Sequence, residues 1–184
     1  MNRQEAWNLL VTSLKQENLV KHCLATEAIM RALAKELGRD VESWGIAGLL
    51  HDLDFEATKD EPHRHTLRTA EVLLEKGLPE EIIQAIKAHN AEALGLNRTG
   101  DMDYALSAAE ALTGLIAAAA LVLPDKKLSS LKPQSILRRM KEKAFARNVN
   151  RETILECEKL GFSLEWFVEL GLRAMQGISQ ELGL

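Results

Sequence analysis

Apolar residues recur about every 3.6 positions along most of the chain, and no segment of useful length alternates between apolar and polar residues. This period matches the turn of an α-helix and predicts helices without strands. We expect helices at residues 3–17, 18–37, 41–53, 65–76, 80–91, 103–123, 133–145, 150–160 and 163–181. Residues that favour helix ends lie at these boundaries, namely glycine stops at Gly38 and Gly77, N-caps at Asp40, Asn150 and Ser163, and first-turn prolines at Pro79 and Pro133.

The composition agrees with a helical fold. Of the 184 residues, 46% are hydrophobic and 27% are charged, which is typical of a globular protein. Only 4% are aromatic and four are proline, and this balance favours helix over strand. No repeat or linker divides the chain. We therefore predict an all-α fold, a single-domain helical bundle that spans residues 1–184.

Residues 104–123 form the most apolar stretch of the chain, and twenty residues are just enough to span a bilayer. This stretch is rich in alanine and carries Glu110, whose charge would cost roughly 2.5–3.5 kcal/mol at a bilayer centre. We therefore interpret it as the central buried helix of the bundle and expect no membrane partner.

The chain start and the cysteines indicate the compartment. The first ten residues contain Glu5 and no continuous apolar run, so we predict no signal peptide. Cys23 and Cys157 are isolated and form no CxxC pattern, so a disulfide framework is not expected. A reducing cytoplasm is the simplest location for such a protein.

Several titratable residues are predicted to face inward. His22 shares a helical stripe with Ile29 and Leu33, and His89 shares another with Ile82 and Ile86. The adjacent pair His51-Asp52 ends a very apolar helix, in which Gly45 and Gly48 would let another helix approach closely. Glu110 is the only charged residue in the apolar stretch of residues 104–123. One hypothesis is that each is a core residue satisfied by hydrogen bonds. The other is that they converge on a divalent cation, which compensates buried carboxylates and accepts imidazole ligands.

These residues resemble the H…HD…D pattern of the HD-domain superfamily of metal-dependent phosphohydrolases. His22, the pair His51-Asp52 and Glu110 match that pattern, and the resemblance covers about residues 18–123. It implies a helical bundle of the HD-domain, phosphodiesterase-like type, on which the helices of residues 124–184 would pack. The segment from His65 to Asn90 is similar to the HDIG-type members, in which additional histidines bind a second metal. The matching positions are His65 and His89, with His63 as an alternative to His65.

The sequence departs from the family pattern at two places. The last acid of the pattern is usually Asp, whereas Glu110 is one methylene longer. The branch that cleaves cyclic dinucleotides has a His-His pair followed by a GYP signature. Here the pair is His89-Asn90 and no GYP follows, which argues against that branch.

The resemblance implies hydrolysis of a phosphoester by metal-activated water, with one or two ions of Mn, Fe, Ni, Co, Zn or Mg. Asp52 is then a ligand at the catalytic centre, and Asp54 is the candidate for orienting a ligand or transferring a proton. Arg64, Arg68 and Lys87 are candidates for binding phosphate. The expected substrate is a nucleotide or another small phosphoester. An oxygen-dependent di-iron enzyme and a non-catalytic nucleotide sensor are the alternatives.

The charge distribution leaves one further feature. The net charge is -4, yet residues 126–151 contain nine Lys or Arg and a single acid, Glu142. This basic segment is either a solvated helix face or a surface that attracts an anionic ligand. Because the whole chain is acidic and the segment lacks interleaved aromatic residues, we expect no nucleic-acid partner. The sequence does not determine the oligomeric state.

Overall fold

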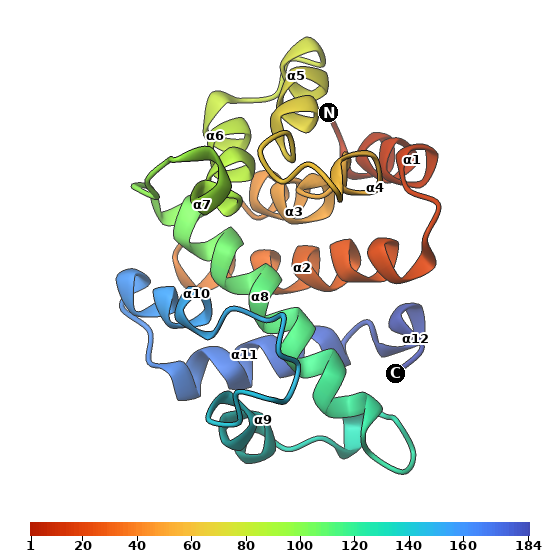
Figure 1. Cartoon of the computed structure of the whole chain (residues 1–184), viewed down its shortest axis with the longest axis vertical. Helices are drawn as coiled ribbons and strands as arrows, with labels where there is room; N and C mark the ends of the chain where they lie inside the picture. Colours follow the sequence, from red (N-terminus) through yellow and green to blue (C-terminus); the bar gives the residue numbers. More distant parts are fainter.

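Helices make up the whole architecture of the computed structural model, which describes residues 1–184 (Figure 1). The α-helices are α1 (Arg3–Ser13), α2 (Glu17–Glu36), α3 (Val41–Leu50), α4 (Phe55–Thr58), α5 (Leu67–Glu75), α6 (Glu80–His89), α7 (Ala91–Leu94), α8 (Asp101–Leu121), α9 (Pro133–Met140), α10 (Arg151–Leu155), α11 (Leu164–Gln176) and α12 (Ser179–Leu182). Two short 3-10 helices, η1 (Leu128–Ser130) and η2 (Glu156–Leu160), complete the chain. The predicted all-α fold is confirmed.

Helix α8 runs diagonally through the molecule and packs against helices from both halves of the chain, including α2, α6, α9, α10 and α11 (Figure 1). It is long and apolar enough to cross a membrane, but 67% of its most apolar window is buried inside the molecule. Its alanines allow this crowding, because small side chains let neighbouring helices approach.

Helices α2 and α3 form the most extensive helix pair in the fold, and Gly48 explains how they pack. A Cβ at Gly48 would lie 2.9 Å from the backbone nitrogen of Glu27, so only glycine allows this separation. The close approach that Gly45 and Gly48 predict is therefore present. It brings the N-terminal half of α2, which carries His22, alongside the end of α3.

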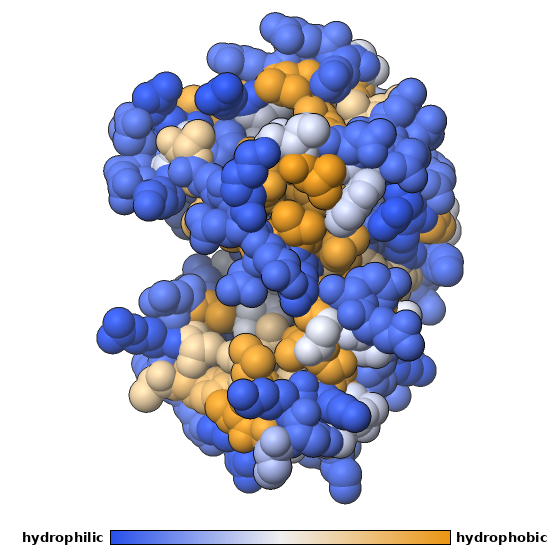
Figure 2. All heavy atoms as spheres, turned by 90° about the vertical axis from the view of Figure 1, so that its right-hand side faces the viewer, coloured by the Kyte–Doolittle hydropathy of each residue, from blue (hydrophilic) through white to orange (hydrophobic).

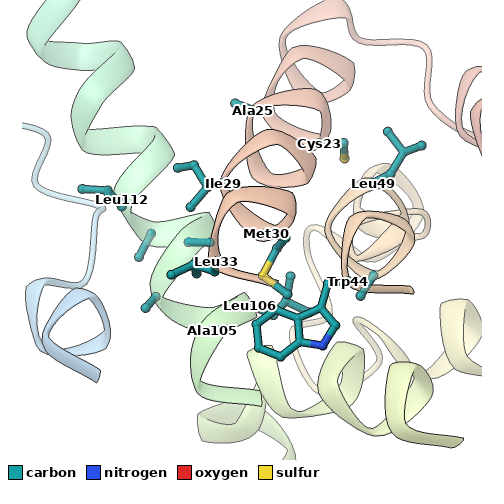
Figure 3. Close-up of a cluster of buried hydrophobic side chains, with 14 of the residues drawn as sticks. Cys23, Ala25, Ile29, Met30, Leu33, Trp44, Leu49, Ala105, Leu106 and Leu112 are labelled. Carbon is teal, nitrogen blue, oxygen red and sulfur yellow. The ribbon is translucent and has the colours of Figure 1, made fainter. Parts of the chain in front are cut away.

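Buried side chains from α2, α3 and α8 lock these three helices together (Figure 3). Met30 and Leu33 of α2 lie in one cluster with Trp44 of α3 and Leu106 of α8, and all four are almost completely buried. The surface is mostly hydrophilic, with apolar side chains gathered in a few places and a recess at mid-height (Figure 2). The core thus fixes the relative positions of α2, α3 and α8, and these helices position much of the candidate site.

Most predicted helices are present, but several end earlier than periodicity indicates. Helix α1 ends at Ser13 instead of residue 17, because the amides of Lys15 and Gln16 donate to Glu56 Oε1 at 2.9 and 2.6 Å. Helix α9 ends at Met140 instead of residue 145. The chain beyond it turns back, and Arg151 donates to the carbonyl oxygens of residues 145, 146 and 149. These partners lie far along the chain or in another element, so helical spacing cannot indicate them.

The cap residues largely behave as predicted. Asp40, Asn150 and Ser163 cap α3, α10 and α11 through their side chains, and Gly38 and Gly77 adopt positive φ. Pro133 begins α9 as expected. Pro79 is an exception, since it is the N-cap of α6 in an extended conformation instead of a first-turn residue. The predicted helix at 65–76 begins at Leu67, because Thr66 has a φ of 76°.

Candidate metal centre

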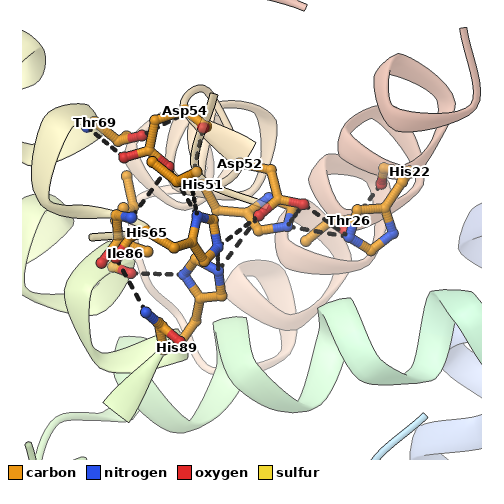
Figure 4. Close-up of polar contacts among 12 residues, drawn as sticks. His22, Thr26, His51, Asp52, Asp54, His65, Thr69, Ile86 and His89 are labelled. Atoms are coloured by element: carbon orange, nitrogen blue, oxygen red, sulfur yellow. Dashed lines mark hydrogen bonds and ion pairs between the residues drawn. The ribbon is translucent and has the colours of Figure 1, made fainter. Parts of the chain in front are cut away.

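Four histidines from four parts of the chain converge on one aspartate (Figure 4). His22 lies in the N-terminal half of α2, and His51 is the residue directly after α3. His65 lies in the loop before α5, and His89 is the last residue of α6. The predicted inward orientation of His22 and His89 therefore matches the structure.

Asp52 lies between two pairs of histidines. Its Oδ2 atom is 3.7 Å from His22 Nε2 and 3.5 Å from His51 Nε2. Its Oδ1 atom is 3.2 Å from His65 Nε2 and 3.5 Å from His89 Nε2. The potential ligand atoms of His22, His51 and Asp52 lie within 4.8 Å of one another, and so do those of Asp52, His65 and His89. One carboxylate thus belongs to two groups of three potential ligands.

The outer nitrogen of every histidine faces a hydrogen-bond acceptor. His51 Nδ1 donates to the carbonyl oxygen of Gly48 at 2.8 Å, and His89 Nδ1 donates to that of Ile86 at 2.6 Å. His65 Nδ1 donates to Asp54 Oδ1 at 2.8 Å.

His22 has the same arrangement through a hydroxyl. Thr113 Oγ1 donates to the carbonyl oxygen of Glu110 at 2.7 Å, so it accepts the proton of His22 Nδ1 at 2.9 Å. In the neutral form that binds metal, each of the four imidazoles therefore carries its proton on Nδ1 and directs Nε2 toward Asp52.

This protonation pattern has a consequence for the two pairs of rings. His22 Nε2 and His51 Nε2 are 3.1 Å apart, and His65 Nε2 and His89 Nε2 are 3.2 Å apart. When the imidazoles are neutral, two lone pairs face each other at this distance and repel. A cation on each side of Asp52 would satisfy both pairs, and metal-bound histidines commonly donate their other nitrogen to a carbonyl or carboxylate. The residues present therefore fit divalent transition metals.

Burial and charge keep the centre in a suitable protonation state. Burial lowers the pKa of His51 to about 3 and also lowers the pKa of His22. Burial opposes ionisation of Asp52, but His51, His65 and His89 more than compensate and hold its pKa well below the usual value. His65 differs, because hydrogen bonds to Asp52 and Asp54 overcome its burial and raise its pKa to about 9. Without metal, a proton on His65 partly takes the place of a cation.

Asp54 contacts the Nδ1 side of the His65 ring, and both of its carboxylate oxygens accept hydrogen bonds. Besides the bond from His65, its carboxylate accepts from the amides of Thr66 and Thr69 at 3.1 and 3.0 Å. These bonds lower its pKa although burial opposes them. Of the two roles expected for Asp54, its contacts match the orientation of a ligand.

Glu110 lies near the centre without belonging to either group of ligand atoms. Its carboxyl makes no hydrogen bond or ion pair within the protein, and burial together with the negative charge of Asp52 raises its pKa to about 8. Its role as a ligand stays a prediction. Asp103, the other acid of α8 near this end, accepts from the amides of Thr99 and Gly100 and therefore caps the helix.

The other predicted site residues are not brought to the centre. His63 is exposed, so His65 is the histidine of this loop that faces Asp52. Arg64 is exposed and pairs with Glu61 at 3.0 Å. Arg68 lines a separate cavity of about 490 Å³. Lys87 is half-buried on α6 and forms no ion pair.

Residues that the sequence analysis missed support the centre from outside. Thr113 orients His22, and Asn90 Nδ2 donates to the carbonyl oxygens of Pro62 and His65 at 2.8 and 3.0 Å, which ties the loop of His65 to α6. Thr113 is three residues after Glu110 on the same helix face, and this spacing is the one signal that could have indicated it.

A cavity of about 390 Å³ opens next to His22 and Thr113. Lys21 and Asn18 supply polar groups to its wall, and Ala117 and Met175 contribute apolar surface. Lys21 is the only Lys or Arg that lines it. Because His22 belongs to both the metal centre and this cavity, a molecule bound in the cavity would contact the centre.

Comparison of the sequence with known proteins shows which proteins the chain resembles. The chain is similar to curated proteins named ribonuclease Y, with 32% identity over 98 residues for that of Desulfotalea psychrophila and 35% over 81 residues for that of Nitratidesulfovibrio vulgaris. These regions cover 53% and 44% of this chain but only 18% and 15% of those relatives. The ribonuclease Y of Protochlamydia amoebophila is 27% identical over 139 residues, 74% of this chain and 26% of the relative. No solved structure matches the chain.

The family comparison covers the whole metal centre. The HD domain matches residues 19–122, more than half of the chain, and this range includes His22, His51, Asp52 and every other residue of the two ligand groups. The chain therefore belongs to the HD domain family, a superfamily of metal-dependent phosphohydrolases.

Proposed function

We propose that this chain binds two divalent cations, one on each side of Asp52, and hydrolyses phosphodiester bonds in RNA. The observation that carries the proposal is the arrangement of four histidine Nε2 atoms in two pairs around a single carboxylate. Two-metal centres serve phosphoryl chemistry in many phosphatases and nucleases. The mixed nitrogen and oxygen ligands favour Mn, Fe, Co, Ni or Zn over Mg.

In this proposal the chain's own residues fix the positions of the ions and the substrate. His22 and His51 would hold one ion and His65 and His89 the other, and Asp52 would be available to both. Glu110 is proposed as a further ligand, once its carboxyl has lost its proton. When bound, the cations supply Lewis-acid activation of water and neutralise charge on the phosphoryl oxygens. Asp54 acts as a positioning residue, since its carboxylate is hydrogen-bonded to His65 and two amides.

The cavity beside His22 is the proposed place for the nucleoside next to the scissile phosphate. Its volume of about 390 Å³ lies within the range of small-molecule sites. Lys21, which pairs with Glu17 at 2.7 Å, would contact phosphate in place of that partner, and Ala117 and Met175 would contact the base. Arg64, Arg68 and Lys87, expected from the sequence to bind phosphate, are farther from the centre in this scheme and are not assigned a role.

RNA is favoured as the substrate because the curated relatives named above are ribonucleases by name. This inference replaces the expectation that nucleic acid is not a partner. The matched regions cover only a small share of those relatives. A small nucleotide is therefore the alternative substrate, and the experiment compares it with RNA. No observation favours a di-iron oxygenase or a nucleotide sensor over hydrolysis.

The experiment is a hydrolysis assay with metal-free protein reloaded with Mn, Fe, Co, Ni, Zn or Mg. The substrates are an oligoribonucleotide, a dinucleotide and a nucleoside monophosphate. We expect metal-dependent cleavage of a phosphodiester, a loss of at least 100-fold in His51→Ala, and activity like the parent's in His63→Ala, the matched exposed histidine.

Absence of hydrolysis with every metal, or equal activity in His51→Ala, would overturn the proposal. Iron-dependent uptake of oxygen would instead indicate the oxidative enzyme. Tight nucleotide binding without turnover would indicate the sensor.

A further inference from the structure

The basic loop, residues 141–150, has a fixed shape because two arginines are used to hold it. Arg151 donates to the carbonyl oxygens of Ala146 and Val149 at 2.6 and 2.7 Å, and also to that of Phe145. The guanidinium of Arg139 lies 4.2 Å from the centre of the Phe145 ring and pairs with Glu142 at 2.6 Å. The loop is therefore braced from both ends.

The other cations of the basic loop are free. The side chains of Lys141, Lys143 and Arg147 are exposed and form no ion pair or hydrogen bond with the protein. The only acid of the loop, Glu142, is already paired with Arg139 and lies 3.7 Å from Arg138. Three unneutralised positive charges thus stand on a braced loop of a protein whose net charge is -4. Such a surface attracts a polyanion.

The basic loop packs on α8 at a residue that lines the cavity beside His22. Val149 Cγ2 lies 3.1 Å from the place where a Cβ of Gly114 would be, and Gly114 lines that cavity. Figure 1 shows the chain between α9 and α10 crossing over the middle of α8, where Gly114 lies. Gly114 directly follows Thr113, the hydrogen-bond partner of His22. The free cations are therefore carried by the loop that borders the route to the metal centre.

We propose that the basic loop docks the phosphate backbone of single-stranded RNA and leads the strand into the cavity beside His22. This inference rests on the proposed function and deepens it, because it makes the substrate an extended strand. Charge without interleaved exposed aromatic rings indicates contact with phosphates, which carry no sequence information. Lys141, Lys143 and Arg147 would contact phosphates outside the cavity. Inside the cavity, Lys21 would exchange its present partner, Glu17 at 2.7 Å, for a phosphate.

The test compares uridine oligoribonucleotides of two lengths, a dinucleotide and a 12-mer, on Lys143→Gln/Arg147→Gln. We expect KM for the 12-mer to rise about tenfold and activity on the dinucleotide to stay at the parent's level, since only the longer strand reaches the loop. The dependence of 12-mer binding on salt should also weaken, by about 0.7 in the logarithmic slope for each phosphate that the variant no longer neutralises. Lys35→Gln/Lys76→Gln, the same charge change at exposed lysines of other helices, should behave like the parent.

Equal KM values for both lengths in the parent, or an equal effect of the control pair, would overturn the inference. If the parent hydrolyses no oligonucleotide, the proposed function fails. Binding of a fluorescent 12-mer then still tests whether the basic loop docks RNA. Binding that is salt-dependent and weakened only in Lys143→Gln/Arg147→Gln would support docking. Absence of binding would reject it.

Discussion

At the scale of single residues, the metal centre depends on where each imidazole places its proton. Helical phase predicts that His22 and His89 face inward, because both lie within regular helices. It cannot distinguish His63 from His65, since both lie in a loop whose path is set by Asn90 and Asp54. The acceptors that orient the rings come from other elements or from the backbone, so composition and spacing do not indicate them.

Thr113 provides a direct test of ring orientation. Thr113→Val keeps the shape of the side chain but removes the acceptor for His22 Nδ1, so the ring is no longer held by the hydrogen bond that leaves Nε2 free for metal. We expect metal affinity to fall 10–100-fold with the fold intact. Calorimetric titration of the metal-free protein measures this, and Thr153→Val, a buried threonine of α10 remote from the histidines, serves as the control. Unchanged affinity in Thr113→Val would show that the hydroxyl does not orient His22.

Glu110 connects the charge of the centre to the stability of the metal-free protein. Burial and Asp52 raise its pKa from 4.5 to about 8, so the folded protein keeps its proton where the unfolded chain loses it. The free energy of unfolding should therefore fall as pH rises from about 4.5 to about 8. Glu110→Gln removes this titration. We expect the variant to resemble the parent at pH 4 and to exceed its stability by about 2 kcal/mol at pH 8, less than the whole shift implies because Glu110 partly reaches solvent.

Urea unfolding of both proteins in chelator at the two pH values measures the difference. Metal affinity of Glu110→Gln, measured separately, tests the ligand role: a sharp loss supports it. If the Gln variant binds metal and turns over substrate like the parent, Glu110 is not a ligand. Asp54 and Asp103 are poor replacements, since both carboxylates are occupied by backbone amides.

At the scale of elements, the fold was predictable where local signals act alone. Asp40 and Ser163 cap their helices as their positions indicate, and Gly48 lies where two helices approach. The early end of α1 was not predictable, since it depends on Glu56, forty residues away. The loop after α9 depends likewise on Arg151, whose bonds to three carbonyls replace continued helix.

The approach of α2 and α3 should control both stability and metal binding. In Gly48→Ala the new methyl would lie 2.9 Å from a backbone nitrogen of α2, so the helices must move apart. We expect a loss of about 1–3 kcal/mol in unfolding free energy and weaker binding at the His22–His51 pair. Gly45→Ala is the comparison on the same helix, because the nearest atoms to its methyl belong to the Arg31 side chain, whose bonds to Glu27 and Glu42 it would disturb without pressing on the backbone of α2. Gly45→Ala should lose stability, measured by urea unfolding, but keep its metal affinity, and equal losses of metal affinity in both variants would contradict this account of the interface.

At the scale of the whole molecule, the histidine–aspartate cluster joins distant parts of one fold. His22 belongs to α2, His51 and Asp52 follow α3, His65 lies in the loop before α5, and His89 ends α6. The sequence predicted the family and the bundle, because the H…HD pattern and helical periodicity are both local. It did not predict that Asp52 would offer one oxygen to each pair, which depends on the packing of all these elements.

Metal binding should therefore stabilise the entire fold, in two separable steps. A ligand that binds only the folded state adds about 2.7 kcal/mol at a hundred times its Kd, so the parent loaded with Mn or Zn should unfold at a higher temperature than the chelated protein.

Because the two histidine pairs share only Asp52, His65→Ala should lower the metal content from two ions per chain to one and remove part of this gain. Asp52→Ala should lose both ions and the whole gain, whereas His63→Ala should match the parent. Elemental analysis and thermal unfolding of the same samples measure content and stability together. Loss of both ions in His65→Ala with the fold preserved would show that the two pairs act as one site, and retention of both would show that His65 is not a ligand.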